Sequence, residues 1–215
     1  MATKLRLFNG ALTELGERRV ADTGEVILAA QELVAVYDQV VEECLAAGSW
    51  NFAMETVKAA ADTGVTPGFG FTEVFAKPSD WVRTIGLSAD EYFSYPLTGN
   101  EVYDDANFWS ADVTPIYVRY VSNDTGLGLE LTRWPANFAR YVELELAVRT
   151  CYRLTQNSSL LERVEKKRDK ARRTALNRDA MNEGQPHFTP AGTWTRARSG
   201  GASNNDRGSR GSLTG

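Results

Sequence analysis

A run of apolar residues at helical spacing, followed at once by glycine, proline and aromatic residues, is the feature that most constrains this fold. Apolar side chains recur with a period near 3.6 residues from Val26 to Leu45, which predicts an amphipathic helix. The tetrapeptide Asp22-Thr23-Gly24-Glu25 has the spacing of a capping box and predicts the start of the helix there, and Gly48 predicts its end. Beyond Gly48 the sequence no longer has the helical pattern of apolar residues.

The segment 50–133 predicts a small β-rich insertion. Phe71 to Phe75 and Ile116 to Val121 are rich in β-forming residues, and prolines punctuate the segment. A short helix is expected at Ser79 to Ile85, whereas Ala53 to Ala61 fits either strand or helix. Aromatic rings bury large areas, so the aromatic side chains are expected to form the core of the insertion. The proposed core residues are Trp50, Phe52, Phe71, Phe75 and Trp81.

Three further helices are expected, at Leu5 to Leu15, at Pro135 to about Thr155, and at Leu160 to about Asn182. The sequence therefore predicts an α+β fold that is mainly α. It is a bundle of long helices with an inserted small β-rich domain and an extended C-terminal tail. The expected domains are a helical body at 1–49 and 134–183, an insertion at 50–133, and a tail at 184–215 that a partner would order.

The charge distribution is asymmetric. Residues 162–183 carry eight basic and five acidic side chains, and the tail adds four arginines and one aspartate, so a net charge of -4 leaves residues 1–161 strongly acidic. The last helix has a thin apolar stripe beneath its charges, which fits a solvated face or contact with an acidic protein surface or nucleic acid. Its candidate contact residues are Arg163, Lys166, Lys167, Lys170 and Arg173.

Catalytic and metal-binding patterns are missing from the sequence. His187 is the only histidine, and the two cysteines, Cys44 and Cys151, are expected to be buried free thiols. The glycine-rich stretch 64–70 lacks the Gly-Lys-Ser/Thr ending of a phosphate-binding loop. We therefore expect no enzyme, no cofactor and no metal. The sequence shows no membrane-length apolar run and no secretory signal, and synthesis in a cytoplasm is expected.

The order of the motifs resembles one protein family. A short helix is followed by a long helix, by Ser49-Trp50-Asn51-Phe52-Ala53, by Gly68-Phe69-Gly70-Phe71, and by Phe75-Ala76-Lys77-Pro78-Ser79-Asp80-Trp81-Val82-Arg83. Two long helices and Ala197-Arg198 come later. This order is similar to that of the head-to-tail adaptors of short-tailed bacteriophages, often called tail tubular protein A. Lys77 stands where an apolar residue usually precedes the proline.

The resemblance implies a structural virion protein of the tail or neck, made in the cytoplasm of a bacterial host. It implies a ring, usually dodecameric, that joins the portal protein to a tail nozzle similar to tail tubular protein B, with tail fibres as possible further partners. Genomic DNA would pass through without specific binding. The helical body would form the ring, the insertion would face the tail, and the C-terminal tail would bind the portal. The tail residues assigned to that contact are Phe188, Trp194, Arg196 and Arg198.

A second interpretation comes from charge alone. The basic last helix and the Arg/Gly/Ser tail also fit an RNA- or DNA-binding module. The two interpretations differ in their expected salt dependence, because neutralising phosphates makes affinity fall steeply as salt rises.

Overall fold

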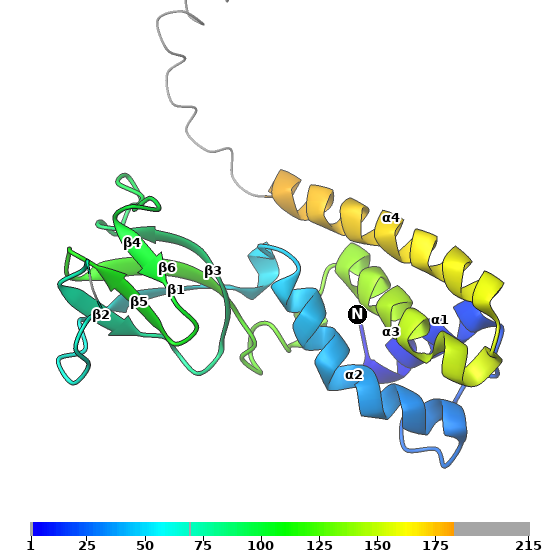
Figure 1. Ribbon diagram of the computed structural model, residues 1–215. Helices are drawn as coiled ribbons and strands as arrows, with labels where there is room; N and C mark the ends of the chain where they lie inside the picture. The colour runs from blue at the N-terminus through cyan, green and yellow to red at the C-terminus, as the bar shows by residue number, and fades with distance from the viewer. Residues whose placement is uncertain (1, 69, 183–215) are drawn as a thin grey trace, which may run out of the picture. The chain divides into compact units, whose positions relative to one another are not determined.

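The computed structural model describes residues 2–68 and 70–182 (Figure 1). Its elements, in chain order, are α1 (Lys4–Leu15), α2 (Leu28–Ala46), the 3-10 turn η1 (Asn51–Ala53), β1 (Met54–Ala59), β2 (Glu73–Ala76), β3 (Trp81–Ser88), β4 (Val102–Asp104), β5 (Phe108–Ala111), β6 (Ile116–Ser122), the 3-10 turn η2 (Leu131–Arg133), α3 (Ala136–Thr155) and α4 (Ser158–Asn182). The mainly helical α+β class is confirmed. All the described strands lie between α2 and α3.

The helices pack around α3. It contacts α1, α2 and α4, and α2 and α4 lie on different sides of it (Figure 1). This central position explains why α3 buries residues on most of its circumference, including the carboxylates of Glu143 and Glu145. Both carboxylates bind arginines, as buried charges require. The predicted spans of α1, α3 and α4 are confirmed to within one or two residues.

The predicted start of α2 at the capping box is wrong. The helix begins at Leu28, with Ile27 as an N-cap residue that makes no side-chain cap bond. Asp22 accepts a hydrogen bond from the Gly24 amide, and the Glu25 carboxylate accepts one from the Ala21 amide and pairs with Arg18. These bonds stabilise a separate turn before the helix. Asp22 and Glu25 therefore stabilise a loop and do not cap α2.

The six strands of the described residues form two antiparallel sheets of three strands each, in the orders β1-β6-β3 and β2-β5-β4. The segment that fitted strand or helix is strand β1. Phe75, Trp109 and Ala111 from the second sheet form one apolar cluster with Leu87 and Ile116 of the first. Together with Val118 and Tyr120, which are also in this cluster, they join the two sheets.

The helix predicted at Ser79 to Ile85 is wrong, because residues from Trp81 onward form β3. The strand pairs with β6, and its register shifts between Trp81 and Arg83 and again between Thr84 and Gly86. Val82, Thr84 and Ile85 are β-branched and favour an extended backbone. Their strand partner lies far along the chain, where a local pattern gives no indication of it.

Trp50 and Phe52 do not belong to the core of the insertion, as the sequence had suggested. Both lie in the helical core, where each ring centroid is 4.8 Å from that of Phe138. The indole Nε1 of Trp50 donates to the Cys44 carbonyl at 2.9 Å. Trp50 therefore closes the C-terminal end of α2 against α3.

Residues Met1–Asn182 form one compact unit, and residues 183–215 lie outside the described part. The division of the compact unit into a helical body and an insertion stays a prediction. Arg83 of β3 donates to the Ala46 carbonyl of α2 at 3.3 Å, and Val121 of β6 is buried in the helical core. Sheet and helices thus share contacts.

Candidate functional site

Helix α4 carries the candidate contact surface. Asn157 caps its first turn, because its side chain accepts a hydrogen bond from the Leu160 amide at 3.1 Å. Val164 and Ala175 are buried against the helical core, and Leu161, Ala171 and Leu176 pack there partly buried. This narrow stripe agrees with the one expected from the sequence and leaves most of the helix circumference to charged residues.

The five predicted contact residues of α4 are exposed and lie on one side of the helix. We call Arg163, Lys166, Lys167, Lys170 and Arg173 the basic row. Helical spacing places Lys166, Lys170 and Arg173 away from the buried Val164 and Ala175. Lys167 lies beside the buried stripe and reaches Glu14 of α1. The structure therefore brings the predicted residues together on one surface.

Most of the basic row has no counter-charge within the described chain. Lys167 pairs with Glu14 of α1 at 2.7 Å, and Arg173 donates to the Asp169 carbonyl at 3.3 Å. The side chains of Arg163, Lys166 and Lys170 make no hydrogen bond or ion pair with any residue that the structure describes. These three charges are available to a partner.

Another arginine of α4 has a structural role. Arg168 points toward α3, where it binds the buried Glu145 carboxylate at 2.8 Å, and it also binds Asp169. Partial burial alone would lower the pKa of this guanidinium, but the bonds with the two carboxylates outweigh it and raise the pKa. Arg168 neutralises a buried charge of the core and is not part of the contact surface.

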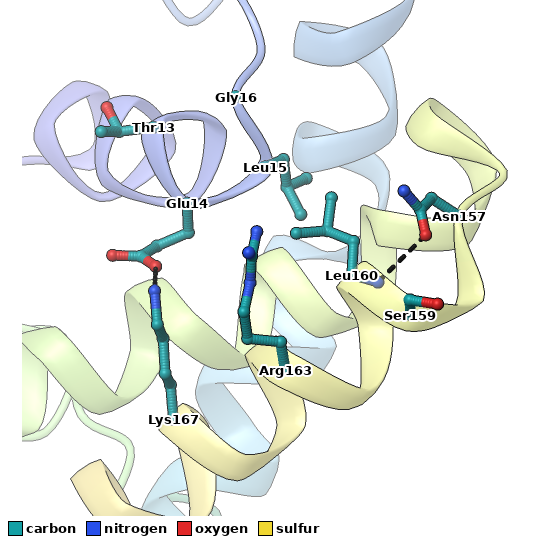
Figure 2. Close-up of a pocket in the computed structure, with 9 residues that line it drawn as sticks. All are labelled: Thr13, Glu14, Leu15, Gly16, Asn157, Ser159, Leu160, Arg163 and Lys167. Atoms are coloured by element: carbon teal, nitrogen blue, oxygen red, sulfur yellow. Dashed lines mark hydrogen bonds and ion pairs between the residues drawn. The ribbon is translucent and has the colours of Figure 1, made fainter.

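An open groove of about 610 Å³ lies where the start of α4 meets the end of α1 (Figure 2). Its lining includes Arg163, Lys167, Asn157 and Glu14. Figure 2 shows the Arg163 side chain extending toward α1 between Glu14 and Leu160, while Lys167 binds Glu14. Two residues of the basic row, Arg163 and Lys167, therefore line this groove.

The remaining predicted core residues lie in or beside the sheets. Phe75 is fully buried between the sheets, and Trp81 packs partly buried against the same cluster. Phe71 is partly buried and lines a separate hollow of about 530 Å³ with Tyr103 and Phe108. Phe75 and Trp81 thus belong to the expected core, whereas Phe71 lies outside the apolar cluster, so its predicted place in that core is wrong.

Sequence reasoning missed the role of Lys77. Its ammonium group lies 3.4 Å from the ring centroid of Trp81 and binds Asp104 and the Asp105 carbonyl, and its side chain is only 4% exposed. A cation over an indole face is stabilised by the ring quadrupole. These contacts explain how a lysine is accommodated at this nearly buried position. Asp104 supplies its counter-charge, and Asp105 contributes only its backbone carbonyl.

The proposed tail residues Phe188, Trp194, Arg196 and Arg198 lie outside the described residues, as does His187. Within the described part, no three histidine, cysteine or carboxylate side chains are placed to hold a metal ion. Cys44 and Cys151 are buried free thiols, as expected. No described helix combines the length and the apolarity that crossing a bilayer requires.

Comparison with models of protein families and with curated proteins finds no match for this chain. The functional assignment therefore depends on the order of the motifs and on the surface of α4.

Proposed function

We propose that this protein is a head-to-tail adaptor of a short-tailed bacteriophage, a structural ring protein between the portal and the tail nozzle. The observation that supports this most directly is the basic row of α4. A long helix that buries only a narrow stripe exposes three unpaired basic side chains along its outer face. Such a surface suits assembly with an acidic protein partner.

The sheets support the same proposal. Two small antiparallel sheets are inserted between α2 and α3, at the place where the family has its tail-facing part. The motif blocks of the resemblance have structural roles in this chain. Trp50 and Phe52 close the helical core, and Lys77, Asp80 and Trp81 join β3 to its neighbours.

The test is binding to the portal protein encoded by the same genome. We expect the full chain to be retained on immobilised portal rings, and a chain that ends at Glu183 to stay folded but to lose this binding. Phe188→Ala with Trp194→Ala should weaken retention, whereas Asn204→Ala with Asn205→Ala is the matched control. Undiminished binding by the shortened chain would contradict the assignment of the tail.

Fluorescence anisotropy with labelled single-stranded and double-stranded oligonucleotides tests the nucleic-acid interpretation. An adaptor should bind them weakly and without sequence preference. Tight binding that falls steeply between about 50 mM and about 200 mM salt would instead identify a nucleic-acid-binding module.

A further inference from the structure

Two helices on different sides of α3 carry opposite charges. Helix α2 has four acidic side chains and no basic one. Helix α4 has eight basic and four acidic side chains. The charge excess of one helix matches that of the other in size and opposes it in sign.

The acidic side chains of α2 divide into two groups. Glu32 pairs with Arg153 at 3.2 Å, and Glu43 pairs with Arg149, so both are neutralised by α3. Asp38 and Glu42 are exposed and have no hydrogen bond or ion pair among the residues described. Both side chains are exposed, whereas Leu33, Val40 and Leu45 of the same helix are buried.

Apolar side chains accompany these two carboxylates. Val34 is 43% exposed and Leu28 is 53% exposed, and Ala35 is exposed beside them. We call Leu28, Val34, Ala35, Asp38 and Glu42 the α2 outer face. Exposed apolar groups bordered by charges of one sign suit contact with a surface of the opposite charge.

The spacing of the charges agrees between the two faces. Asp38 and Glu42 are four residues apart, as are Lys166 and Lys170, so each pair spans about 6 Å along its helix. The long stems of Lys166, Lys170 and Arg173 can cover the apolar groups of a facing helix while their charged ends reach carboxylates. The two faces are complementary, but α3 separates them within one chain.

We propose that the α2 outer face of one copy of this chain docks on the basic row of a second copy. This inference rests on the proposed function and names the contact by which neighbouring subunits would meet. Because each copy uses two different faces, the contact is head-to-tail, and repeating it generates a ring if the rotation closes. Pairing of like faces would place equal charges opposite each other.

Charge reversal on the full chain tests the proposal. Asp38→Lys with Glu42→Lys makes both faces basic, and Lys166→Glu with Lys170→Glu makes both acidic. Each double variant alone should self-associate about ten-fold more weakly or worse, because two ion pairs are replaced by repulsion. An equimolar mixture of the two variants should associate again, since each supplies the face that the other needs.

Sedimentation velocity over a range of protein concentrations is the measurement, at about 50 mM and about 500 mM NaCl. Arg172→Glu with Arg178→Glu is the matched control, because it makes the same charge change on α4 outside the basic row. It should associate as the unmodified chain does. High salt should weaken association of the unmodified chain and of the mixture alike.

Three results would overturn the proposal: an unmodified chain that stays monomeric throughout, double variants that associate normally, or a mixture that fails to recover. The portal-retention assay separates this failure from that of the proposed function. If the chain binds portal rings but shows none of the charge-reversal pattern, the proposed function stands and the proposed contact between copies is wrong. If the chain shows the pattern but does not bind the portal, the contact stands and the proposed function is wrong.

Discussion

Gly128 allows the loop before α3 to approach the end of β6. A Cβ atom at this position would lie 1.9 Å from the backbone oxygen of Ser122, and the Gly128 carbonyl accepts the indole hydrogen of Trp134 at 2.8 Å. Because a backbone oxygen cannot rotate away as a side chain can, the main chain itself would have to shift. This position therefore excludes any larger residue.

We predict that Gly128→Ala lowers the free energy of unfolding by about 2 kcal/mol or more. Urea titration followed by circular dichroism measures the change. Gly99→Ala is the control, since nothing lies within 4 Å of a Cβ atom there. Equal losses in the two variants would show that the close approach has no energetic consequence.

Glu14 joins α1 to two other helices through Lys167 and Arg140. Partial burial would raise its pKa, but the hydrogen bonds from the two basic residues outweigh burial and hold the pKa below its ordinary value of 4.5. A carboxyl whose pKa is lowered by folding stabilises the protein above its unfolded pKa. That stabilisation is lost as pH falls through the folded value.

Glu14→Gln should therefore cost about 1 kcal/mol near neutral pH, a modest value because Lys167 and Arg140 are partly exposed. At acidic pH below the lowered pKa, the variant and the unmodified chain should have the same stability. Urea unfolding at both pH values tests this, with the exposed Glu17→Gln as control. A difference that persists unchanged in acid would assign the effect to packing and not to charge.

At the scale of elements, Asp179 and Asn51 bind the C-terminal end of α4 to the turn η1. The Asp179 carboxylate accepts the Asn51 amide hydrogen at 3.0 Å, and the Asn51 side chain donates to the Asp179 carbonyl at 2.8 Å. Asp179 is buried, so removing its carboxylate leaves the partly buried Asn51 amide without this acceptor. The bond fixes α4 against the turn that leads into β1.

Asp179→Ala should lower the free energy of unfolding by about 2 kcal/mol and increase hydrogen exchange in the last two turns of α4. Exchange in α1 should change little. Asn177→Ala, at an exposed position in the same turn, is the matched control. Uniformly faster exchange in every helix would mean that the pair stabilises the whole molecule and not this end.

Elements with a local signal were predictable, and those that depend on distant partners were not. The apolar period predicted α1, α3 and α4, and Pro135 also indicated the start of α3. The start of α2 was missed because Asp22 and Glu25 bind within their own turn, and nothing local distinguishes that turn from a helix cap. The strand β3 and the position of Trp50 depend on β6 and Phe138, which lie far along the chain.

The candidate site was predictable in part for the same reason. Helical spacing alone places the basic row on one face, so the sequence sufficed for it. Which charges lack partners depends on tertiary contacts, such as Glu14 with Lys167 and Glu145 with Arg168. The contacts of Lys77 with Trp81 and Asp104 depend on the pairing of strands, and no local sequence pattern predicts them.

For the whole molecule, β6 connects the two apolar clusters. Val121 is buried in the helical core, while Val118 and Tyr120 of the same strand are buried between the sheets. Because residues of this one strand belong to both clusters, unfolding of β6 in one cluster would also disrupt its packing in the other. The clusters are therefore expected to unfold together.

Native-state hydrogen exchange should give the same opening free energy for the central amides of α3 and of β6. Val121→Ala should lower both by a similar amount, on the order of 1 kcal/mol or more, since it removes methyl groups from a fully buried site. Sheet amides that exchange at a clearly lower free energy than those of α3 would show two independently unfolding parts.

The opposed charges of α2 and α4 also act before any contact forms. They give the helical body a permanent electric dipole directed across α3, and a second copy that diffuses within about 10 Å at physiological salt is turned by that field. Subunits would then arrive already oriented head to tail. On this proposal, the charges of the two helices set the productive fraction of encounters and hence the rate of assembly.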